Sequence, residues 1–141
     1  MYSLQGKTLS YALDRHGRCR SFQNLLTGHE YIHTPGALWK MIYLIHGTER
    51  AEVPVWADRQ RFTASADATE ITLMYDGLIG EEDRRIDATL TLHLRMTDPG
   101  LQVTAELANH DPSVQLVELQ LTPVSGARSL GGRPEDDAIA W

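Results

Sequence analysis

Cysteine is nearly absent from this 141-residue sequence: Cys19 is the single one, so no disulfide can form within the chain. No apolar run approaches the roughly 18 residues that a membrane-spanning helix requires. Lysine and arginine form no cluster, and 13 basic against 19 acidic residues leave a net charge of −6. Such a chain has little with which to offset phosphate repulsion. We therefore expect no disulfide scaffold, no membrane partner and no nucleic-acid partner.

The first residues also lack the charged and then apolar pattern of a secretory leader. The chain is therefore expected to be either cytoplasmic or a protein whose leader has been removed. The sequence does not decide between these two compartments. The composition is ordinary for a globular protein, with 42% hydrophobic and 23% charged residues. A chain of this length suggests one domain, which buries roughly 68–70% of its unfolded surface.

Helical periodicity with caps and adequate length is missing throughout, and alternation of apolar and polar residues takes its place. Residues 85–96 alternate strictly, residues 97–100 (Thr-Asp-Pro-Gly) are typical of a tight turn, and residues 101–107 alternate again. This pattern predicts a β-hairpin over 85–107. A further strand over 114–122 would place Val117, Leu119 and Leu121 on one apolar face.

The first half of the chain predicts shorter strands. Residues 37–45 form a nearly continuous apolar run, typical of a strand covered on both sides, and Pro54 confines its strand to a sheet edge or a bulge. Roughly eight or nine short strands predict an all-β, antiparallel β-sandwich. We place the sandwich at residues 1–124 and read residues 125–141 as an irregular tail or a connection to a missing region. The remaining predicted strands are 9–13, 19–26, 53–57, 59–65 and 69–75.

Residues 29–33 read His-Glu-Tyr-Ile-His and match the H-E-x-x-H pattern of zinc metalloproteases. The pattern binds zinc only on a helix, where residues four apart share one face. Pro35 disfavours helix at the preceding residue, and about six residues are too few for a stable helix. In an extended chain, at ~3.3 Å per residue, the two histidines would lie roughly 13 Å apart. We interpret the match as chance and expect neither a metal nor a cofactor.

Two longer segments carry a family resemblance. Residues 8–32 hold a D-x-x-G turn (Asp14, Gly17) and end in an N-x-x-T-G-x-E-Y-I pattern from Asn24, while residues 87–126 hold a long strand, a tight turn, a strand ending in Asn109 and a strand ending at Pro123. Both resemble the N-terminal domain of bacterial glycoside hydrolases of the galactose-mutarotase-like class. The resemblance implies a large supersandwich, a carbohydrate partner and a catalytic domain that this chain does not include.

Aldose epimerases of the same superfamily hold sugar at an Asn-His step, which Asn109-His110 matches. The aromatic residues that normally follow are replaced by Asp111-Pro112-Ser113, and the later strands with the catalytic His and Glu have no counterpart. The resemblance implies a non-catalytic, carbohydrate-associated β-sandwich, the N-terminal portion of a multidomain glycoside hydrolase. Two alternatives stay open: a sugar mutarotase or epimerase with His110 as its acid/base group, and a structural module that docks on a missing catalytic domain or another copy of the chain.

A carbohydrate site needs an aromatic side chain on which the sugar stacks, beside polar groups that hydrogen-bond its hydroxyls. We name Trp56 and Tyr75 as candidate platforms, and Asn109 and His110 as candidate polar groups. The predicted hairpin over 85–107 also has a polar face that mixes donors and acceptors, which suits neutral hydroxyls. That face carries Arg85, Asp87, His93, Arg95, Gln102 and Glu106.

The interpretation of residues 29–33 has a direct test. Because His29 and His33 should not share one helix face, we expect the purified chain to contain no stoichiometric zinc when its metal content is measured by mass spectrometry. One zinc per chain in the parent, lost in the His29→Ala variant, would contradict this interpretation.

Overall fold

The computed structural model describes residues 1–48 and 53–127. Every strand pair in these ranges is antiparallel, and the two helices are single 3-10 turns, which confirms the all-β, antiparallel fold class. None of the described segments is a helix long and apolar enough to cross a membrane. The elements are β1 (Tyr2–Gln5), β2 (Leu9–Leu13), β3 (Cys19–Asn24), β4 (Trp39–Ile45), β5 (Val53–Trp56), η1 (Ala57–Arg59), β6 (Thr63–Ala66), β7 (Glu70–Ile79), η2 (Glu81–Asp83), β8 (Arg85–Met96), β9 (Leu101–Asn109) and β10 (Val114–Leu121).

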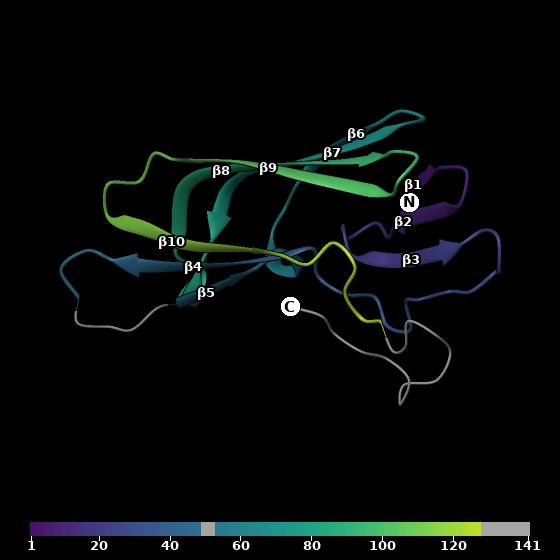
Figure 1. Cartoon of the computed structure of the whole chain (residues 1–141). Helices are drawn as coiled ribbons and strands as arrows, with labels where there is room; N and C mark the ends of the chain where they lie inside the picture. The colour runs from purple at the N-terminus through teal and green to yellow at the C-terminus, as the bar shows by residue number, and fades with distance from the viewer. Residues whose placement is uncertain (49–52, 128–141) are drawn as a thin grey trace.

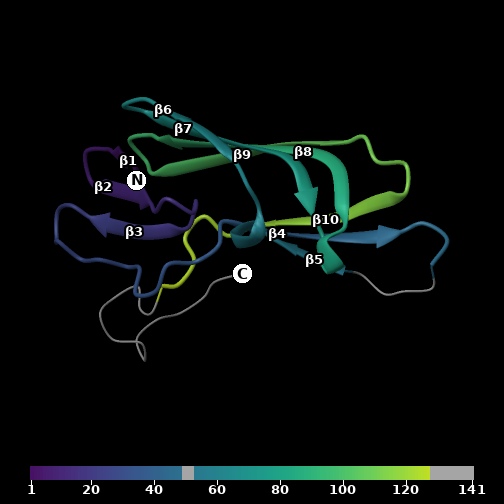
Figure 2. The ribbon, with the colours of Figure 1, turned by 180° about the vertical axis from the view of Figure 1, so that it is seen from behind.

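The strands form three sheets in two layers. A four-stranded sheet, in the order β6-β7-β8-β9, makes the upper layer in Figure 1. Two three-stranded sheets, β10-β4-β5 and β1-β2-β3, lie beneath opposite ends of it, and Figure 2 shows the same arrangement from behind. The layers bury one face of each sheet between them and leave the outer faces to solvent.

The predicted hairpin over 85–107 is confirmed as β8 and β9. The two strands pair without a register shift from Ala88–Asn109 to Met96–Leu101. On β8 every second side chain, from Ile86 to Met96, is buried, as strict alternation predicts for a strand with one covered face.

Strand β10 departs from the predicted alternation. Its register with β4 shifts between Leu116 and Glu118, which makes Val117 a bulge residue. Leu116 and Leu119 pack against the core, whereas Val117 is 43% exposed. The prediction that Val117 shares an apolar face with Leu119 and Leu121 is therefore wrong, because the bulge inserts one residue between them.

Strand β4 is fully covered on one side only, which corrects the expectation for residues 37–45. Trp39, Met41 and Tyr43 are buried, while Lys40 and Ile42 between them are half-buried and face outward. The apolar run over residues 37–45 looks continuous in the sequence because Ile42, which faces outward, is apolar as well. The neighbouring strand β5 is an edge strand, as its proline predicted.

One apolar core joins all three sheets, and four aromatic side chains mark its centre. The ring of Trp39 on β4 packs edge-to-face on Tyr75 of β7, with centroids 5.1 Å apart, and the ring of Phe62 also packs against Tyr75, at 5.5 Å. Tyr11 on β2 is 1% exposed and brings the third sheet into the same cluster. We call Tyr11, Trp39, Phe62 and Tyr75 the aromatic seam. Each such ring pair contributes about 0.5–1.5 kcal/mol beyond the area it buries.

Residues 122–127 fasten the end of the described chain to the domain. The Tyr11 hydroxyl donates to the carbonyl oxygen of Pro123 at 2.6 Å, and the Ser125 hydroxyl donates to that of Ala37 at 2.9 Å. Gly126 has φ +82°, and a Cβ at this position would lie 1.8 Å from the carbonyl oxygen of Thr34. Residues 125–127 thus still contact the domain, and the rest of the predicted tail, 128–141, lies outside the described residues.

We expect the Tyr11→Phe variant to lose about 1–2 kcal/mol of unfolding free energy, because the partly buried Pro123 carbonyl loses its donor. Urea unfolding followed by circular dichroism measures the loss. Tyr2→Phe is the matched control, since no described residue hydrogen-bonds the Tyr2 hydroxyl. Equal losses in the two variants would show that the Tyr11 hydroxyl does not stabilise this closure.

Candidate functional site

The zinc-like stretch at residues 29–33 is not helical and runs beside β3. Glu30 forms an isolated antiparallel bridge with Gln23, and its carboxylate accepts hydrogen bonds from the Ser21 hydroxyl and from the backbone N–H groups of Phe22 and Ile32, the last two at 2.9 Å. Burial opposes ionisation, but these hydrogen bonds outweigh it and hold the pKa of Glu30 below its ordinary value. Its carboxylate therefore holds this loop beside β3. In the described part of the chain no three His, Cys, Asp or Glu side chains gather as a metal site would require.

Tyr75 is not available to a ligand. It is 1% exposed, and its ring contacts those of Trp39 and Phe62 in the aromatic seam. Burial raises the pKa of its hydroxyl to about 12, so the ring stays neutral in the core. The prediction of Tyr75 as a sugar platform is corrected: its alternation with Ile71 and Leu73 places it on the inner face of β7.

Asn109 is the last residue of β9, and His110 begins the turn that leads to β10. The Asn109 amide donates to the Val114 carbonyl oxygen and accepts from the Asp111 N–H, both at 3.0 Å. The His110 N–H donates to the carbonyl oxygen of Asp87 at 2.8 Å, and its side chain is exposed. The Asn109 side chain is thus built into the turn, whereas the His110 ring faces solvent.

Trp56 lies on the outer face of the β10-β4-β5 sheet, where its side chain is 43% exposed. In the sheet register it stands opposite Lys40, which stands opposite Gln120 on the other side. The Lys40 ammonium lies 4.9 Å from the centroid of the indole ring, and the Gln120 amide donates to the Glu118 carboxylate at 2.7 Å. We call Trp56, Lys40, Gln120 and Glu118 the Trp56 platform. It combines an aromatic surface, an ammonium, an amide and a carboxylate on three adjacent strands.

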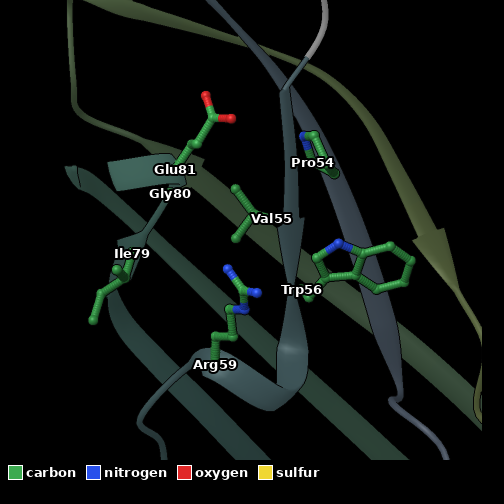
Figure 3. Close-up of a pocket in the computed structure, with 7 residues that line it drawn as sticks. All are labelled: Pro54, Val55, Trp56, Arg59, Ile79, Gly80 and Glu81. Atoms are coloured by element: carbon green, nitrogen blue, oxygen red, sulfur yellow. The ribbon is translucent and has the colours of Figure 1, made fainter. Parts of the chain in front are cut away.

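A hollow of about 220 Å³ lies along the free edge of β5. Its lining includes Val55 and Ile79, with Arg59 and Glu81 as polar groups. Figure 3 shows that the Trp56 indole points to the opposite side of β5 from Arg59 and Glu81. Trp56 also lines this hollow, but its indole ring extends to the other side of β5, over β4.

Trp56 and the Asn109 turn do not form one site. Trp56 is level with Lys40, whereas the Asn109 amide binds Val114, which is level with Ile45. Lys40 and Ile45 are separated by five positions on β4, or roughly 17 Å at ~3.3 Å per residue. One monosaccharide cannot contact both, so the structure separates the aromatic candidate from the polar ones.

The outer face of β7, β8 and β9 carries a second polar group of side chains around Glu70. The Glu70 carboxylate lies 3.0 Å from His93 Nδ1 and accepts two hydrogen bonds from Arg95, at 2.6 and 2.9 Å. Hydrogen bonds from Arg95 and then His93 lower the pKa of Glu70. Two residues of the predicted polar face, His93 and Arg95, are thus already bound to a carboxylate on the neighbouring strand. The group around Glu70 contains no aromatic ring on which a sugar could stack, in contrast to the Trp56 platform.

Sequence reasoning found Trp56 but missed its three neighbours. Lys40, Glu118 and Gln120 come from strands far apart in the chain, and only the strand order places them beside the indole. In the sequence, each of these three residues has the pattern of an ordinary outward-facing strand residue. The chain matches no protein-family model, and no curated protein is significantly similar to it.

Proposed function

We propose that this chain is a non-catalytic, carbohydrate-associated β-sandwich, the N-terminal portion of a multidomain glycoside hydrolase, and that its two layers belong to a galactose-mutarotase-like supersandwich. The observation that carries the proposal is the Trp56 platform, an exposed indole on an outer sheet face beside three hydrogen-bonding side chains. The family resemblance of residues 8–32 and 87–126 supports the same class of partner.

The platform chemistry suits a neutral sugar. An indole face packs against the C–H groups of a pyranose ring, while an ammonium and an amide donate to hydroxyls and a carboxylate accepts from them. Lys40 and Glu118 cancel in charge, so the platform attracts neither phosphates nor cations strongly. Because the platform lies on a sheet rather than in a cleft, it fits an extended oligosaccharide better than a single enclosed sugar.

The same geometry argues against hydrolysis by this part of the protein. Retaining glycosidases place two carboxyl groups about 5–5.5 Å apart on either side of the scissile bond, and inverting enzymes about 6.5–9.5 Å apart. The platform contributes a single carboxylate, that of Glu118, and Gln120 already donates a hydrogen bond to it. We therefore assign the platform to binding, with catalysis supplied by a further domain of the parent enzyme.

Calorimetric titration with neutral oligosaccharides tests the proposal. We expect binding by the parent chain and a loss of roughly five- to 150-fold in affinity for Trp56→Ala, because one stacked ring contributes about 1–3 kcal/mol, by analogy with bases stacked on aromatics. Trp56→Phe should retain part of the affinity, since it keeps a smaller ring face.

Met74→Ala is the matched control, because Met74 is similarly exposed at 41% and lies on the other layer. No binding by the parent, or equal affinity in Trp56→Ala and Met74→Ala, would contradict the proposal. Catalysed mutarotation of fresh α-glucose or α-galactose that disappears in His110→Ala would replace it with the epimerase alternative.

A further inference from the structure

Strand β9 is the least protected edge among the described strands. Natural sheets shield their edges with short strands, prolines, bulges, lysines or covering loops. β1 and β6 have four residues each, β5 contains Pro54, β10 has its bulge at Val117, and β3 is bridged by Gly36 and Glu30. β9 has nine residues, no proline or lysine, and regular pairing with β8 along its whole length.

The direction of the backbone groups on β9 follows from its ladder. Thr97 and Gly100 exchange both hydrogen bonds, and the His110 N–H donates to Asp87, so the even-numbered residues of β9 bond to β8. Hydrogen-bonded and non-hydrogen-bonded residues alternate along an antiparallel strand. The odd-numbered residues therefore direct their N–H and C=O groups toward the free edge, and no described residue bonds them. These residues are Leu101, Val103, Ala105, Leu107 and Asn109.

The inner face of β9 is only partly covered. Leu101, Val103 and Ala105 are half-buried, and Leu107 is 38% exposed although its partner on β8, Leu90, is fully buried. An apolar row therefore lies beside the unpaired backbone groups. Whatever pairs with β9 would cover this row at the same time.

We propose that β9 pairs antiparallel with β9 of a second copy of this chain, about a two-fold axis at Thr104. In this register Val103 faces Ala105 of the partner, and both have edge-directed backbone groups, so the ladder is continuous. On the outer face Gln102 meets Glu106 of the partner subunit twice, and Thr104 meets its own counterpart. No like charges face each other, and on the inner face Leu101 lies opposite Leu107 of the partner subunit.

A centre at Thr104 joins the two four-stranded sheets into one sheet of eight strands. The residues at the axis form a non-hydrogen-bonded pair, whose Cα atoms lie about 4.5 Å apart. Two cysteines at such a separation can form a disulfide, which requires Cα atoms about 4.4–6.8 Å apart. The register can therefore be tested by cross-linking.

The experiment compares Thr104→Cys with Gln102→Cys, two exposed positions on the outer face of β9. Diamide serves as the oxidant and takes the two electrons and two protons released by each thiol pair. The native Cys19 is fully buried and so contributes little background. We expect a cross-linked dimer from Thr104→Cys and far less from Gln102→Cys, because Gln102 faces Glu106 of the partner subunit. Equal cross-linking of both variants, or none in either, would overturn the register.

Sedimentation velocity over a range of protein concentrations tests the association itself. We expect the parent chain to dimerise, Thr104→Glu to weaken the dimer several-fold by placing two carboxylates opposite each other, and Gln102→Lys to strengthen it by facing Glu106 of the partner subunit. A parent that stays monomeric at every concentration, or a dimer that neither substitution changes, would overturn the proposal. Circular dichroism of each variant shows whether the monomer fold is retained.

Discussion

The edge-to-face contact between Trp39 and Tyr75 is the interaction on which the rest of the structure depends. It joins the β10-β4-β5 sheet to the four-stranded sheet, and Tyr11 brings the β1-β2-β3 sheet into the same core. Each of the three antiparallel sheets has one apolar face, which must pack against another layer. The aromatic seam supplies that partner at the place where all three meet, and the hydrogen bond from Tyr11 to Pro123 fastens the end of the described chain to it.

This arrangement also determines where ligands and partners have access. The inner faces are filled by the seam and by the leucines of β8, so only outer faces, turns and edges remain. One outer face is occupied by the ion-paired group around Glu70, whereas the other carries the Trp56 platform. The proposed carbohydrate surface and the proposed β9 edge belong to different sheets, so the two can operate independently of each other.

Much of the fold could be predicted from the sequence, because alternation on 85–96 and 101–107 directly reflects one buried face. The bulge at Val117 could not be predicted, because residues 117, 119 and 121 alternate regularly with polar residues in the sequence and nothing there marks the shift in register. Tyr75 was placed at a ligand site although its phase with Ile71 and Leu73 indicates the core. The platform needed the strand order, because Lys40 and Gln120 are 80 positions apart in the chain and adjacent in the register.

The most direct test of this account is to map, by two-dimensional NMR of ¹⁵N-labelled chain, which amides shift when a neutral oligosaccharide is added. The account predicts shifts confined to the outer face of the β10-β4-β5 sheet, centred on the Trp56 indole N–H and the amides of Lys40 and Gln120. Shifts centred instead on the turn at Asn109 and His110, or no shifts at saturating sugar, would contradict it.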